Sequence, residues 1–159
     1  MSQESRIEAF ELKVLGDIER EGWSCMAVFP TEEEPGENFN YTVGLSTSYR
    51  HPELILVGMN LDQGHGVLAS AVAAIKREAV FAPDTYSTAV LKGYRVAFLE
   101  VDDPFGGEMP MSMTHRLVGH VACLQLVWPD VRDRFPWHDD FDSEYAGRQI
   151  LLGEWRGKE

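Results

Sequence analysis

Residues 41–60, YTVGLSTSYRHPELILVGMN, constrain the fold more than any other stretch of the chain. At its start, Tyr41, Val43 and Leu45 alternate with Thr42 and Gly44, which is the two-residue period of a half-buried strand. Residues 54–57 form an uninterrupted apolar run, which is typical of a strand covered on both faces. Only a polar segment, residues 46–52, separates the two runs. The stretch therefore predicts two core strands joined by a short polar turn.

The remaining segments alternate between helical and extended periods. The predicted helices span residues 4–21, 60–79 and 110–119, with Gly22 ending the first and Asn60 or Asp62 capping the second. The predicted strands span residues 23–29, 39–45, 53–59, 94–101 and 121–128, and residues 81–92 are either a short strand or a loop. Short connections between neighbouring strands favour an antiparallel meander. We therefore expect an α+β fold with a mainly antiparallel sheet of about five strands and helices packed on it.

Length and composition favour one domain over residues 1–159, because no repeat or linker interrupts the chain. The 14 basic and 26 acidic residues give a net charge of -12. Such a surface repels phosphate backbones and anionic lipids, so we expect no nucleic-acid partner and no membrane partner. The start lacks a signal-peptide pattern, and no apolar run reaches the roughly 20 residues of a membrane span. Cys25 and Cys123 lie in apolar runs as buried thiols, so we expect a cytoplasmic protein.

Three blocks of sequence resemble a known family. They are Gly22-Trp23, the YTVGL…HPELILVG stretch of residues 41–58, and LQLVWPD…RFPW over residues 124–137; the ILLG ending at residues 150–153 adds to them. Together they resemble the bacterial family called domain of unknown function four-two-six-two, over a family-like core of residues 22–153. The resemblance implies a small bacterial cytoplasmic domain. It carries no activity, so the catalytic residues and any cofactor stay open.

Trp128, Pro129 and Asp130 also resemble the general-acid loop of tyrosine phosphatases. Those enzymes need an Arg six positions after the catalytic Cys, whereas Thr31 follows Cys25 and Pro129 follows Cys123 at that spacing. Phosphatase chemistry is therefore excluded. We interpret Trp128, Asp130 and Trp137 as structural or pocket-lining residues, because Trp next to Pro covers apolar area and helps to fix a loop.

Metal and nucleophile motifs are incomplete. His115 and His120 are five positions apart and are expected to face differently, unlike the i and i+4 pair of a zinc helix. The acidic segment 138–144 lacks the glycine and spacing of a calcium loop, so we predict no metal site. Gly44-Leu45-Ser46 begins a nucleophile-elbow pattern, but Ser48 stands where the second Gly is required.

The predicted ligand site is the polar segment after residue 45, which consists of Ser46, Thr47, Ser48, Tyr49, Arg50 and His51. Its hydroxyl groups and its arginine could bind a phosphate or carboxylate, and the histidine could titrate near neutral pH. The alternative is an ordinary turn whose hydroxyls bond to its own backbone. The acidic loop 32–37 is expected at the opposite end of the meander, which favours an anion at this end.

These features favour a protein that binds a small anionic ligand or a protein partner. One alternative is a flavin- or nucleotide-dependent enzyme of split-barrel type, because those barrels hold phosphate with a hydroxyl-rich turn after a strand. The other alternative is a non-catalytic interaction or immunity-type protein, which would use the acidic surface against a basic partner.

Overall fold

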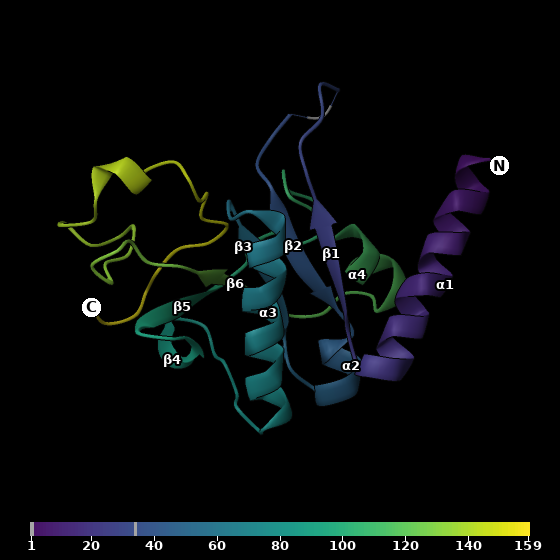
Figure 1. Cartoon of the computed structure of the whole chain (residues 1–159), viewed down its shortest axis with the longest axis horizontal. Coiled ribbons are helices and arrows are strands. Elements are labelled where there is room, and N and C mark those ends of the chain that lie inside the picture. Colours follow the sequence, from purple (N-terminus) through teal and green to yellow (C-terminus); the bar gives the residue numbers. More distant parts are fainter. Residues whose placement is uncertain (1, 34) are drawn as a thin grey trace.

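The computed structural model describes residues 2–33 and 35–159, which contain one six-stranded sheet in the order β1-β2-β3-β6-β5-β4 (Figure 1). Its strands are β1 (Ser24–Val28), β2 (Phe39–Val43), β3 (Glu53–Val57), β4 (Thr85–Leu91), β5 (Tyr94–Glu100) and β6 (Cys123–Val127). The helices are α1 (Gln3–Glu21), α2 (Leu45–Tyr49), α3 (Leu61–Lys76) and α4 (Ser112–Leu117), and a 3-10 turn, η1, spans Ser143–Tyr145. The predicted α+β class is confirmed.

The order of the strands departs from a simple meander at β3. The pairs β1–β2 and β2–β3 are antiparallel, as predicted, but β3 pairs in parallel with β6. The ambiguous residues 81–92 contain β4, which raises the predicted number of strands by one. The sheet is open, with β1 and β4 at its edges, so it is not the closed barrel of the split-barrel comparison.

Helix α3 covers one face of the sheet. Its buried side chains, including Leu68, Val72 and Ile75, pack on the side chains of β3 and β6 that point to this face. The predicted helix start is confirmed, because Asn60 Oδ1 accepts hydrogen bonds from the backbone amides of Asp62 and Gln63.

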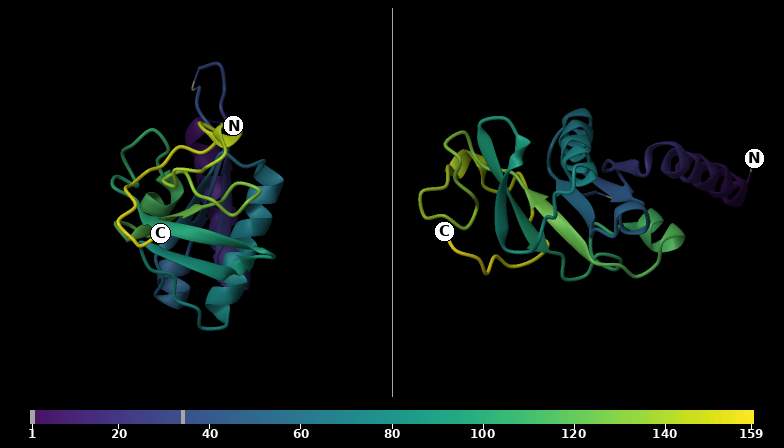
Figure 2. Two further views of the ribbon diagram at one scale, coloured as in Figure 1. Left: turned by 90° about the vertical axis from the view of Figure 1, so that its left-hand side faces the viewer. Right: turned by 90° about the horizontal axis from the view of Figure 1, so that it is seen from below.

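The opposite face is covered by α4, its flanking loops and the C-terminal tail (Figure 2). Met109 and Met111 pack there against Ile55 and Val57 of β3. The tail has little regular structure, but buried Gln125 of β6 holds it at two points. The Gln125 side chain donates to the Ile150 carbonyl and accepts from the Leu152 amide.

Helix α1 projects from the β1 edge of the sheet (Figures 1 and 2). Val14 is its buried residue, and Glu11 forms an ion pair with Arg116 of α4. The helix ends as predicted: Gly22 has a φ of 88°, and its N–H donates to the Ile18 carbonyl. No helix among the described residues is long and apolar enough to cross a membrane.

The prediction of a polar turn between β2 and β3 is wrong, because this segment is helical. Residues 45–49 form the short helix α2, and Arg50 ends it with a φ of 52°. The reason lies in the first residue of β3, Glu53, whose carboxylate binds the amides that begin this helix.

Candidate functional site

The carboxylate of buried Glu53 lies against the start of the predicted ligand segment. Its Oε1 accepts from Thr42 Oγ1 at 2.8 Å and from the Leu45 amide at 3.0 Å. Its Oε2 accepts from the amides of Gly44 and Ser46 and, at 2.7 Å, from Ser46 Oγ. The side chain is 0% exposed. The negative charge that a helix start attracts is therefore supplied by the protein itself.

The hydroxyls of Ser48 and Tyr49 bind the C-terminal end of α1. Ser48 Oγ donates to the Gly22 carbonyl at 2.7 Å, and Tyr49 Oη donates to the Glu21 carbonyl at 3.3 Å. These bonds satisfy carbonyl groups that a helix end leaves without partners. The two side chains therefore join α2 to α1.

His51 is also held by its neighbours. Its Nδ1 lies 2.8 Å from the Pro52 carbonyl oxygen, and its Nε2 accepts the Phe81 amide at 2.9 Å. Thr47 and Arg50 are exposed and make no side-chain hydrogen bond or ion pair with any residue in the described ranges. Anion binding at this segment stays a prediction, and it rests on these two residues.

Asp130 organises the loop that follows β6. Its carboxylate is 1% exposed and accepts hydrogen bonds from the backbone amides of Arg132, Arg134 and Asp142. Burial alone would raise the pKa of Asp130, but these amides, helped by the Arg132 charge, outweigh it and lower the pKa. The structure thus places Asp130 as an internal anchor of the loop.

The two predicted tryptophans pack in different places. Trp128 Nε1 donates to the Val57 carbonyl at 3.0 Å, which ties the end of β6 to β3. Trp137 stacks on Trp155, with ring centroids 4.5 Å apart, and its Nε1 donates to Tyr86 Oη. Their contacts are those of side chains that fix loops on the sheet.

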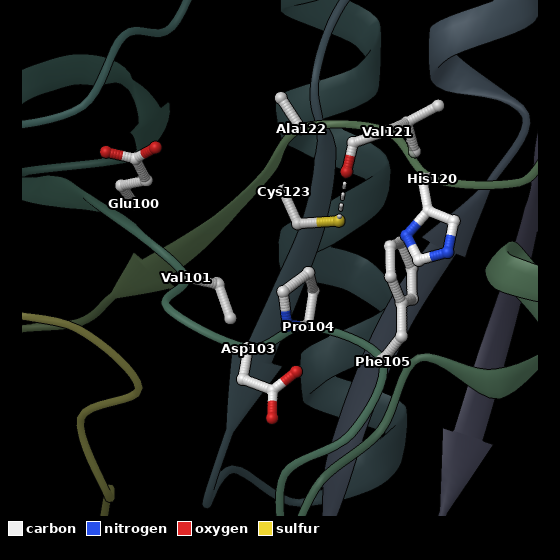
Figure 3. Close-up of a pocket in the computed structure, with 9 residues that line it drawn as sticks. All are labelled: Glu100, Val101, Asp103, Pro104, Phe105, His120, Val121, Ala122 and Cys123. Carbon is white, nitrogen blue, oxygen red and sulfur yellow. Dashed lines mark hydrogen bonds between the residues drawn. The ribbon is translucent and has the colours of Figure 1, made fainter.

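An open pocket of about 410 Å³ lies where the loop after β5 meets the segment leading into β6. It is lined by Glu100, Val101, Asp103, Pro104, Phe105, His120, Val121, Ala122 and Cys123. Figure 3 shows Pro104 and Phe105 between the Asp103 carboxylate and the His120 imidazole, with Glu100 set apart from them. None of these residues was predicted as a site residue, because only the tertiary fold brings the two segments together.

The pocket is acidic, since its lining contains Glu100 and Asp103 and no Lys or Arg. The carboxylates of Glu100 and Asp103 are exposed and have no ion pair or hydrogen bond with any residue that the structure describes. Burial, followed by the nearby Glu53 carboxylate, raises the pKa of Cys123 to about 12. Its thiol is therefore protonated at neutral pH and is not a nucleophile.

Beside the pocket, His115 of α4 lies against His120. Their Nε2 atoms are 3.2 Å apart, so the prediction that they face differently is wrong. The chain turns back after α4 at Gly119, which has a φ of 97°, and brings the second imidazole to the first. In the described part of the chain, no group of three or more His, Cys, Asp or Glu could hold a metal ion.

The fold and the pocket define an α+β protein with an open mixed sheet and a small acidic pocket. The chain belongs to the family described as Domain of unknown function (DUF4262), whose family model matches residues 17–142. This confirms the resemblance predicted from the sequence blocks, although the match ends before residues 150–153. Neither a curated protein nor a solved structure matches the chain. The family's description names no activity, so function has to be inferred from the site.

Proposed function

We propose that this protein binds a small organic cation, a protonated amine with an apolar body, in the pocket of Figure 3. The observation that supports this most is the exposed Asp103 carboxylate, which lines the pocket together with apolar and aromatic residues and has no cationic partner in the described residues. An ammonium group would supply that partner through a charge-assisted hydrogen bond.

The walls suit the rest of such a ligand. Val101, Pro104 and Val121 offer apolar contact, and the Phe105 ring can face a positive charge. The volume of about 410 Å³ falls in the usual range for small-molecule sites, about 300–1,000 Å³. The net charge of -12 attracts cations and repels anions at long range.

Binding is favoured over catalysis at this pocket. The thiol of Cys123 in this pocket is protonated, since its pKa is raised. Its Sγ already donates to the backbone carbonyl of Val121 at 3.5 Å. A flavin or nucleotide phosphate would meet the carboxylates of Glu100 and Asp103. The same argument applies to a small anion, for which the exposed Thr47 and Arg50 remain the better candidates.

The test is calorimetry with two ligands that share a phenylethyl group but carry opposite charges, 2-phenylethylamine and 3-phenylpropionate. We expect saturable binding of the amine alone, and an affinity about tenfold lower in Asp103→Asn because the charge is lost. Asp139→Asn, which removes an exposed carboxylate elsewhere, is the matched control and should bind normally. Equal binding of the carboxylate ligand, or an unchanged affinity in Asp103→Asn, would refute the proposal.

A protein partner is the second candidate, at a groove of about 630 Å³ between the β1–β2 loop and residues 108–112. The groove combines exposed Phe29, which is 64% accessible, with apolar Met109 and the carboxylates of Glu37 and Glu108. This chemistry suits a basic segment with apolar side chains. A peptide of alternating Lys and Leu should bind more weakly in added salt and to the Phe29→Ser variant. An affinity that neither change lowers would exclude this groove as the binding site.

A further inference from the structure

We propose that His115 and His120 together bind one divalent transition-metal ion at the edge of the pocket. The two imidazoles are exposed, and their Nε2 atoms lie 3.2 Å apart. Imidazole nitrogen is a preferred ligand of Zn²⁺, Cu²⁺ and Ni²⁺. The proposal does not rest on amine binding, since a metal ion needs only the two rings and water.

The separation of the nitrogens fits shared coordination. Two nitrogens bound to one tetrahedral Zn²⁺ at about 2.0–2.1 Å lie about 3.3 Å from each other. The ring centroids are 4.5 Å apart, and the ring planes meet at 66°. The two Nε2 atoms are therefore the facing atoms of two inclined rings, at the separation that one ion needs.

Phe105 fixes the orientation of both rings. It stacks on His115, with centroids 4.8 Å apart and planes at 21°, and it meets His120 edge-on at 5.3 Å and 88°. His115 is carried by α4, whereas His120 follows the turn at Gly119. Holding the rings before the ion arrives reduces the side-chain entropy lost on binding. Phe105 is thus a positioning residue for the pair.

The remaining coordination positions fall to water. No third His, Cys, Asp or Glu in the described ranges is close enough to complete a set of three, so the site is open. Because His120 also lines the pocket, the ion would stand beside any molecule bound there. With imidazole ligands, the affinity should increase from Co²⁺ through Ni²⁺ to Cu²⁺, and the hard ions Mg²⁺ and Ca²⁺ should not compete.

The experiment titrates tag-free protein with Zn²⁺ while the histidine ring signals are followed by NMR, and calorimetry repeats the titration with Cu²⁺ and Mg²⁺. We expect one ion per chain, shifts in the His115 and His120 rings only, and no Mg²⁺ binding. His115→Ala and His120→Ala should each weaken binding by more than about tenfold. His65→Ala, which removes an exposed histidine of α3, is the matched control and should bind normally. Phe105→Leu should weaken binding less than loss of either ligand.

The proposal is overturned by an absence of saturable Zn²⁺ binding, by equal binding of Mg²⁺, or by binding that survives both histidine substitutions. Exposed rings can be removed with little effect on folding, and circular dichroism of each variant verifies this. Asp103→Asn should keep the Zn²⁺-induced shifts in both rings while losing amine affinity. The metal and amine proposals can therefore fail separately.

Discussion

At the scale of single residues, Glu53 shows how a buried carboxylate can be held by backbone amides and hydroxyl groups. Its two oxygens accept five hydrogen bonds, three from backbone amides and two from hydroxyls. Charge-assisted bonds of this kind offset the cost of taking a carboxylate out of water. The same bonds begin α2, so one side chain determines the path of the chain between β2 and β3.

Glu53→Gln should destabilise the fold by about 3 kcal/mol, because one carboxylate oxygen is replaced by an NH2 group, a donor that faces donors. The measurement is the free energy of unfolding in urea. Glu8→Gln, on the exposed surface of α1, should change it by less than about 0.5 kcal/mol. If the two variants were equally stable, the Glu53 carboxylate would not be the organising group.

The sequence identifies the polar segment 46–51 but not its internal bonds. A Glu at the start of a strand is usually solvated, and nothing local shows that Glu53 is 0% exposed. The hydroxyls of Ser46 and Ser48 therefore resembled free donors, although they bond to Glu53 and to Gly22. The pocket at Asp103 was missed for a different reason, since only the tertiary fold brings its two segments together.

At the scale of elements, α3 packs closely on β2 through Asn40. The Asn40 side chain donates to the Leu61 carbonyl at 3.1 Å, and its Oδ1 lies where a side chain at Gly64 would be. Gly66, one half-turn further along the helix, faces open space. The two glycines of α3 thus have different roles.

Gly64→Ala should destabilise the protein by about 1–3 kcal/mol, because the new methyl group meets the buried Asn40 amide. Gly66→Ala should stabilise it by about 0.5–1 kcal/mol, because Ala has the higher helix propensity and nothing obstructs it. Thermal unfolding of the two variants provides the comparison. Shifts of the melting temperature in the same direction would contradict this account of α3.

Periodicity predicts the long elements of this fold well. α1 and α3 carry clear apolar faces with Gly22 and Asn60 at their ends, and both boundaries are confirmed. The parallel pairing of β3 with β6 could not be predicted from neighbouring strands, because their partners are separated by α3, β4, β5 and α4. The apolar run of β3 did indicate a central strand, buried on both faces.

At the scale of the whole molecule, the C-terminal tail closes the sheet face opposite α3 through buried His138. Its Nδ1 accepts the Phe135 amide at 2.9 Å, and its Nε2 lies 3.4 Å from Tyr86 Oη. Burial lowers the pKa of His138, and the positive charges of Arg134 and Arg95 lower it further. The Glu159 and Asp140 carboxylates oppose this shift but are outweighed.

This lowered pKa makes stability depend on pH. The unfolded chain takes up the His138 proton near the usual value of about 6.5, before the folded chain does. The stability that neutral His138 contributes is therefore fully present above about pH 6.5, and it is lost as the pH falls through the lower pKa of the folded state. Urea unfolding at several pH values should show the decline. His138→Asn, which keeps an acceptor for the Phe135 amide, should reduce this loss of stability at low pH. His65→Asn should leave it unchanged. The same pH dependence in His138→Asn as in the unmodified protein would show that His138 is not its source.

The central claim is that the acidic pocket formed by the loop after β5 and the segment leading into β6 receives a cation. The most direct measurement is a titration of ¹⁵N-labelled protein with 2-phenylethylamine, followed by amide NMR. We predict saturable shifts at Asp103, Phe105, His120 and Cys123. Shifts confined to Thr47 and Arg50, or no saturable shift at all, would contradict the claim.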